Sequence, residues 1–208
     1  IERVFLPRLA QLGHRVTLTL VKPGFYPVGG GKLTATIEPT QSIAPLELLH
    51  RGEVVAIRAE VLVSKLPMHI AQREQTTLCE RLGIRPAACP IHQLTTSAGP
   101  GNAVLVQIDS ESGGELFSAI GERGVPAEQV AASCADEVHE FLTAAVPVGE
   151  HLADQLLLPL ALGKGGRFLT TRPSLHTLTQ VDTLRAFVPV EISIEQQAGL
   201  AHLVTVRT

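Results

Sequence analysis

One histidine stands where a short strand is expected to give way to a helix. His176 follows Pro173 and Ser174, and Thr177 and Thr179 come shortly after it. A neutral imidazole is a competent nucleophile near neutral pH, because the free group titrates at about pH 6.5. The neighbouring hydroxyl groups are expected to orient the ring. The alternative is a structural or surface histidine, and no serine elbow nearby would complete a hydrolase triad.

A second group of polar residues opens an otherwise apolar stretch of the chain. His151, Asp154 and Gln155 are spaced three and four residues apart, which places them on one face of a helix. Polar groups at the mouth of an apolar helix need partners if they are buried. The group is therefore a candidate ligand-binding surface, and the alternative is a capped helix start with solvated side chains.

The third feature is the glycine-rich segment Pro23–Gly31, which ends in three consecutive glycines. Glycines let the backbone turn tightly and approach another chain or a ligand closely. A hairpin turn is the simplest interpretation. A nucleotide-binding P-loop is excluded, because no Gly-Lys-Ser/Thr follows and a strand, not a helix, is expected after Lys32.

The helices and strands around these residues are predicted from hydrophobic spacing and from capping residues. A helix over 67–82 is expected to be closed by Gly83, with Arg73, Glu74 and Glu80 facing outward. A half-buried strand over 16–20 precedes the glycine-rich segment, and a second alternating strand over 33–37 follows it. The other expected elements are helices over 1–12, 126–142, 149–162 and 174–187, and strands over 53–64, 103–108, 116–120, 168–171, 188–194 and 203–206.

Composition excludes several classes of function. The 208 residues are 45% hydrophobic and 18% charged, which excludes a disordered tail. A net charge of -3 argues against a protein that binds the nucleic-acid backbone over a broad basic face. The absence of tryptophan argues against a surface that stacks several bases. The longest apolar run, 156–162, is too short to span a bilayer. Three cysteines without metal-ligand spacing indicate buried thiols, and a cytoplasmic location is expected.

Taken in order, these segments resemble the RNA 3'-terminal phosphate cyclase family. The match is carried by the segments Gly24–Gly31, Glu150–Leu156 and Pro173–Thr177. Weaker similarity extends over 67–74, 99–102 and 121–128. The resemblance covers essentially the whole chain. It implies a ligase-type enzyme of RNA processing that converts an RNA 3'-phosphate end to a 2',3'-cyclic phosphate and consumes ATP.

The resemblance also implies roles for individual residues. His176 falls on the nucleophile, which attacks the α-phosphorus of ATP and forms a covalent histidine-AMP. His151, Asp154 and Gln155 fall on positions that bind ATP, and relatives often carry tyrosine in place of His151. A divalent cation, Mg or Mn, is expected to be held by ligands outside this chain segment. A homodimer is expected by analogy with relatives.

The fold that the resemblance implies is α+β. A large domain of repeated βαβαββ units, as in EPSP synthase, is expected over 1–51 and 146–208, and a smaller inserted α+β domain over 52–145. The large domain is expected to be incomplete at its N-terminus, since the family chain is longer there. One departure is Pro23, which stands where relatives commonly carry a basic residue, with Lys22 one place earlier.

Two other functions are compatible with the same fold. The first is a non-catalytic, cyclase-like paralogue of ribosome biogenesis, which lacks the adenylylated histidine; His176 argues for the enzyme. The second is an enolpyruvyl transferase, which would need basic residues for two anionic substrates. Seventeen Lys and Arg residues spread thinly along the chain argue against that activity.

Overall fold

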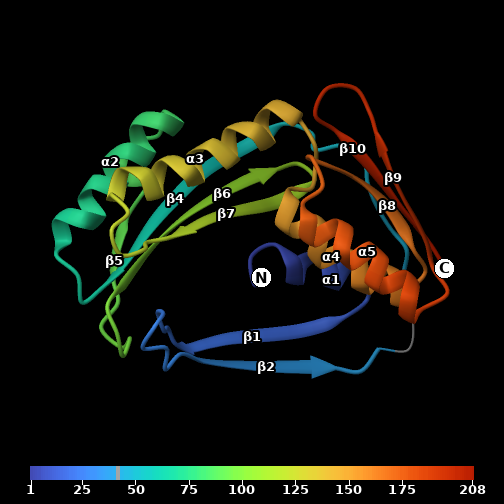
Figure 1. The fold of residues 1–208 in the computed structure, drawn as a ribbon, viewed down its shortest axis with the longest axis horizontal. Coiled ribbons are helices and arrows are strands. Elements are labelled where there is room, and N and C mark those ends of the chain that lie inside the picture. The colour runs from blue at the N-terminus through green and yellow to red at the C-terminus, as the bar shows by residue number, and fades with distance from the viewer. Residues whose placement is uncertain (41–42) are drawn as a thin grey trace.

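A computed structural model describes residues 1–40 and 43–208. Within these residues the chain forms five α-helices and three β-sheets, so the predicted α+β fold class is confirmed (Figure 1). Two of the sheets have four strands each and carry separate hydrophobic cores, and the third is a two-stranded hairpin. No helix in the described part of the chain is long and apolar enough to cross a membrane.

The first four-stranded sheet has the order β3-β8-β10-β9 and is packed against helices α4 and α5 (Figure 1). Leucines at 152, 156 and 160 of α4 recur at helical spacing and are fully buried against Phe168. The elements are α1 (Phe5–Gln11), β3 (Leu46–Leu48), α4 (Glu150–Leu162), β8 (Gly166–Thr170), α5 (Leu175–Phe187), β9 (Glu191–Gln196) and β10 (His202–Arg207).

One edge of β8 is paired with two pieces of chain that are far apart in sequence. Strand β3 runs parallel to β8, with Leu48 opposite Phe168. Val148 then forms a parallel bridge with Thr170, two residues further along β8. The chain thus leaves this ladder after β3 and rejoins it directly before α4.

The second four-stranded sheet has the order β5-β4-β6-β7, and helices α2 and α3 lie on one of its faces (Figure 1). Alternate residues of β6 are buried, as expected for a sheet covered on one side. The elements are β4 (Val54–Ser64), α2 (Met68–Leu82), the 3₁₀ turn η1 (Pro86–Ala88), β5 (Ile91–Gln93), β6 (Gly101–Ser110), β7 (Gly113–Ile120) and α3 (Ala127–Ala144).

The cysteines belong to this second core. Cys89 and Cys134 are buried, Cys79 is half-buried, and all three are free thiols. Burial raises the pKa of Cys134 to about 12, so its thiol is inert at neutral pH. The prediction of buried, unpaired cysteines is confirmed for Cys89 and Cys134.

Strands β1 (Arg15–Lys22) and β2 (Lys32–Glu38) form an antiparallel hairpin that pairs only with itself among the described residues. Strand β1 alternates between exposed and half-buried residues over its first half, as predicted, whereas β2 is exposed throughout its length. Leu33 and Ile37 of β2 are more than half exposed. Alternation in a sequence predicts a strand, but it does not show which face another element covers.

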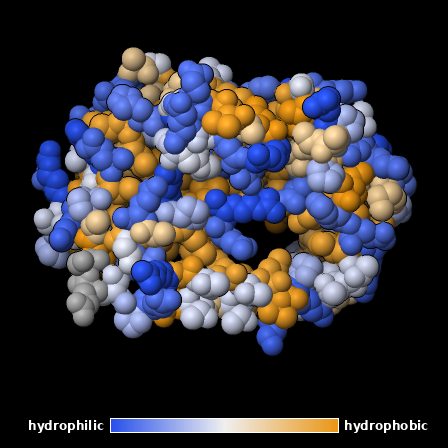
Figure 2. Space-filling view, turned by 180° about the vertical axis from the view of Figure 1, so that it is seen from behind, coloured by the Kyte–Doolittle hydropathy of each residue, from blue (hydrophilic) through white to orange (hydrophobic). Residues whose placement is uncertain are grey.

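The glycine-rich turn of this hairpin reaches the loop before β6. Phe25 packs directly on Gly101, and a Cβ placed at Gly99 would lie 2.7 Å from Cβ of Val28. The hairpin is therefore held at its tip, and Figure 2 shows the molecule hollowed between the hairpin and the remaining elements.

Two expectations need separate comment. Glu74 was expected to face outward from α2, but it is fully buried, because Asn102 at the start of β6 donates a hydrogen bond to its carboxylate. The predicted division into a domain over 1–51 and 146–208 and an inserted domain over 52–145 stays a prediction. The same holds for the repeated βαβαββ units.

Candidate functional site

The first turn of α5 carries His176, which is exposed. Ser174 is the N-cap of this helix: its Oγ accepts a hydrogen bond from the backbone N–H of Thr177 at 3.2 Å. The two side-chain hydroxyls also lie 3.1 Å apart. The hydroxyl of Ser174 thus caps the helix and contacts that of Thr177, while the expectation that the neighbouring hydroxyls orient the histidine ring stays a prediction.

Helices α4 and α5 are joined by a hydrogen-bonded contact close to His176. Gln180 lies one turn after His176, and its side-chain amide faces α4. The amide is assigned with its nitrogen toward α4, because in the opposite orientation its oxygen would face two acceptors. The nitrogen then donates to the carboxylate of Asp154 and, at 2.9 Å, to the backbone oxygen of the same residue. The structure thus links the helix of the predicted nucleophile to one of the predicted ATP-binding residues.

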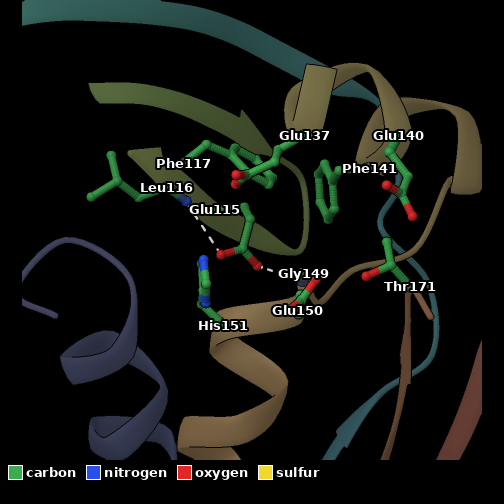
Figure 3. A pocket seen from close by; sticks show the side chains of 10 residues that line it. All are labelled: Glu115, Leu116, Phe117, Glu137, Glu140, Phe141, Gly149, Glu150, His151 and Thr171. Carbon is green, nitrogen blue, oxygen red and sulfur yellow. Dashed lines mark hydrogen bonds between the residues drawn. The ribbon is translucent and has the colours of Figure 1, made fainter. Parts of the chain in front are cut away.

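The three predicted residues of α4 do not share one environment. Asp154 and Gln155 are half-buried, whereas His151 is exposed in the first turn. His151 faces a small acidic cavity that is lined from β7, α3, the start of α4 and the chain after β8 (Figure 3). The helix brings Asp154 toward α5 and leaves His151 toward the second sheet.

Glu115 is the buried acid of this cavity. Only 4% of its surface is exposed, and it accepts hydrogen bonds from the backbone N–H of Gly149 at 2.7 Å and of Leu116 at 3.3 Å (Figure 3). Burial raises the pKa of the Glu115 carboxyl to about 7, and these two hydrogen bonds and the charge of Arg8 oppose the rise.

Three further glutamates line the same cavity: Glu137, Glu140 and Glu150. Burial raises the pKa of Glu137, and the neighbouring carboxylates raise it further, while the charge of His151 lowers it. The cavity next to His151 is therefore electronegative, and it does not suit the phosphate groups of a nucleotide.

A larger cavity of about 690 Å³ opens beside the start of α5. Arg172 and His202 lie on its lining, together with the carboxylates of Glu140 and Glu150 and the apolar side chains of Leu175 and Leu178. The lining does not include the predicted site residues His151, Asp154, Gln155 and His176. Because Ser174 also lines this space, the cavity adjoins the turn that carries His176.

The described residues do not fit a resident metal ion. Residues 1–40 and 43–208 contain no group of three or more His, Cys, Asp or Glu side chains that could hold one. The divalent cation that the resemblance implies, with ligands outside this chain segment, stays a prediction.

Two residues of the site were missed by the sequence interpretation. Gln180 could have been found, because it follows His176 by four residues and so lies on the same helix face. Glu115 carried no local signal, because its contact with Gly149 joins residues 34 positions apart.

Comparison with known proteins relates nearly the whole chain to one family. A family model described as RNA 3'-terminal phosphate cyclase matches residues 1–194. A curated protein of Koribacter versatilis (strain Ellin345), named RNA 3'-terminal phosphate cyclase, is 41% identical over 203 residues. That alignment covers 98% of this chain and 57% of the relative, so the chain spans little more than half of the relative's length.

Proposed function

Since the chain belongs to the RNA 3'-terminal phosphate cyclase family, we propose that the protein converts an RNA 3'-phosphate end to a 2',3'-cyclic phosphate with consumption of ATP. The observation that carries the proposal is the arrangement around α5. His176 is exposed in its first turn, and Gln180, one turn later, binds Asp154 of α4. An exposed imidazole on a fixed helix can meet a substrate held beside it.

The proposed reaction has three steps, each with a defined bond change. The imidazole of His176 attacks the α-phosphorus of ATP, pyrophosphate leaves, and a P–N bond to AMP forms. An oxygen of the RNA 3'-phosphate then attacks this phosphorus and breaks the P–N bond. Finally the adjacent 2'-OH attacks the RNA phosphorus and AMP leaves, so the substrate must be RNA and not DNA.

Asp154 and Gln155 are proposed to contact the nucleoside part of ATP. Both are half-buried on α4, and Asp154 is held by Gln180 in one orientation. A fixed carboxylate accepts hydrogen bonds from hydroxyl or amino groups and repels phosphates. His151 is proposed to stack on or bond to the base from the other side of the same helix turn.

The first test is covalent labelling of the protein made from its complete coding sequence. ATP labelled at the α-phosphate is expected to leave an acid-labile label on His176, and His176→Asn should reduce labelling by at least about a thousandfold. The matched control is His69→Asn, an exposed histidine at the second position of α2, as His176 is the second residue of α5.

The outcome decides between the enzyme and the alternative function. Full labelling and cyclisation in the His176→Asn variant would remove His176 from its role. No label on the intact wild-type protein would contradict the enzyme and favour the non-catalytic paralogue, whose role is binding. The RNA 3'-phosphate end is the proposed partner, while a homodimer and a cytoplasmic location stay predictions.

A further inference from the structure

Helix α4, which carries all three proposed ATP-binding residues, begins without a cap of its own. Its N-cap is Gly149, whose extended backbone (φ −81°, ψ 174°) is normal for this position but which has no side chain to accept a hydrogen bond. The first N–H groups of a helix need acceptors, above all where the start of the helix is buried.

The missing acceptor comes from strand β7. The Oε2 atom of Glu115 lies 2.7 Å from the backbone nitrogen of Gly149, and Oε1 is held by the N–H of Leu116 (Figure 3). The side chain is thus bonded at both oxygens. It joins the second sheet to the N-cap of α4.

Residue 149 is a glycine in a place where no other residue fits without a shift. A Cβ there would lie 3.0 Å from the carboxyl carbon of Glu115, which is tighter than normal packing. The close contact between the start of α4 and the carboxylate therefore depends on both Gly149 and Glu115.

The charges around the carboxylate favour this arrangement. The positive end of the helix dipole is at Gly149, and the charge of the buried Arg8 also favours the ionised carboxylate of Glu115. Arg8 is itself held at the turn between β6 and β7, because it donates to the backbone oxygen of Ser112 at 2.6 Å. Glu137 and the exposed His151 face the same cavity.

We propose that Glu115 is a positioning residue for ATP binding, which fixes the start of α4 and thereby the direction of His151 and Asp154. The inference rests on the proposed function, and it adds that the second sheet is part of the machinery that shapes the ATP site. Glu115 does not touch the reacting atoms, so its effect is on ATP binding more than on the rate of histidine adenylylation.

The test uses the protein made from its complete coding sequence, with Glu115→Ala, Glu115→Gln and, as a control, Glu122→Ala. Glu122 is an exposed glutamate between β7 and α3, and it lines neither of the two cavities described above. ATP affinity is measured by equilibrium titration, the adenylylation rate at saturating ATP by single turnover, and folding by far-UV circular dichroism.

Glu115→Ala is expected to raise the Kd for ATP by roughly tenfold, the effect of losing one charge-assisted hydrogen bond. The single-turnover rate should change by less than about threefold, because the nucleophile is untouched. Glu115→Gln keeps a carbonyl oxygen for the N–H of Gly149 and is expected to restore most of the affinity. Glu122→Ala should bind ATP as the wild type does.

A folded Glu115→Ala variant with wild-type affinity for ATP overturns the inference, since a purely structural contact would lower the melting temperature alone. If Glu115→Ala does not fold, Gly149→Ala decides, because its methyl group pushes the carboxylate away. Wild-type affinity in that variant also overturns the inference. A wild-type protein that is not labelled by ATP refutes the proposed function itself, whatever the variants do.

Discussion

Gln180 is a neutral side chain that binds a carboxylate and a carbonyl oxygen at the same time. Both acceptors belong to Asp154, and only an N–H₂ group with two hydrogens can serve them together without adding charge. Because Gln180 lies one turn from His176, it also fixes the part of α5 on which the proposed nucleophile stands.

Gln180→Glu is expected to lower the free energy of unfolding by about 1–3 kcal/mol near neutral pH, because two carboxylates then face each other without a donor. The adenylylation rate should fall in the same variant. Urea unfolding and α-phosphate labelling measure the two effects. Thr179→Glu adds the same charge at the exposed neighbouring position and should change neither; equal losses in both variants would contradict the assigned contact.

Glu74 is a second residue whose environment is unusual. Burial raises the pKa of its carboxyl to about 7, against which the hydrogen bond from Asn102 acts, and its second oxygen has no hydrogen-bond partner. The folded protein thus keeps this proton to a higher pH than the unfolded chain, in which a glutamate titrates at about 4.3. The stability that this group contributes is present at low pH and is lost as the pH rises to about 7.

Accordingly, the free energy of unfolding is expected to fall between about pH 4 and about pH 7, by roughly 1–3 kcal/mol from Glu74. Glu74→Gln keeps the acceptor for Asn102 and should remove the part of the pH dependence of stability that comes from Glu74. Glu115, whose pKa is also raised, still lowers the stability as the pH rises. Glu80→Gln, at an exposed position of the same helix, is the control. A slope that Glu74→Gln leaves unchanged would refute the assignment, and urea unfolding across this pH range is the measurement.

At the scale of elements, much of the fold was predictable from capping residues. Gly83 ends α2 in the left-handed region, and Gly149 and Ser174 start α4 and α5, all as expected. Strands β3 and β5 were missed, because three residues show no periodicity.

The candidate site was predictable only where its signals are local. The spacing of the polar residues on α4 placed them on one helix, and the resemblance supplied their roles. The contacts of Glu115 with Gly149 and of Glu74 with Asn102 were not predictable, because each joins residues about 30 positions apart. A sequence pattern treats glutamate as an outward residue, and only the folded partner shows that it is buried.

The attachment of the hairpin tip can be tested at one glycine. Gly101→Ala would place a methyl group inside the ring of Phe25, so it is expected to lower the free energy of unfolding by about 1–3 kcal/mol and to speed amide exchange over 25–31. Phe25→Ala added to this variant should cost little more, since the contact is already lost. At Gly114 a Cβ would meet nothing closer than 3.7 Å, so Gly114→Ala is the control.

At the scale of the whole molecule, a few buried contacts join the two cores. Arg8 of α1 binds Ser112, Glu115 binds Gly149, and Arg51 binds the end of α3. The guanidinium of Arg51 donates to the carbonyl oxygens of Phe141 at 3.3 Å and Leu142 at 3.2 Å, and it lies 5.6 Å from the centre of the Phe141 ring. These carbonyls belong to the last turn of α3, where a positive charge is favourable.

Arg51→Ala is therefore expected to lower the free energy of local unfolding of α3 by about 1–2 kcal/mol. The free energy of local unfolding of β8 and β10 should not change. Hydrogen exchange followed by mass spectrometry separates the two regions. Arg51→Lys keeps the charge without the planar fork and should recover part of the loss. Arg207→Ala removes an exposed ion pair with Glu191 and is the control, which should change hydrogen exchange little. An equal loss of protection in both cores after Arg51→Ala would contradict a stabilising effect of Arg51 that is confined to α3.

The split ladder on β8 has an evolutionary consequence. Leu48 and Val148 occupy neighbouring places along one strand edge, about 7 Å apart by the rise of a strand, although 99 residues lie between them. A segment that leaves and returns at adjacent points can be lengthened, shortened or exchanged between descendants without a change of register in β8 or β10. Sequence changes in the second sheet are therefore expected to affect the stability of the first sheet little. The exceptions are changes that remove the contacts of Arg8, Arg51 and Glu115.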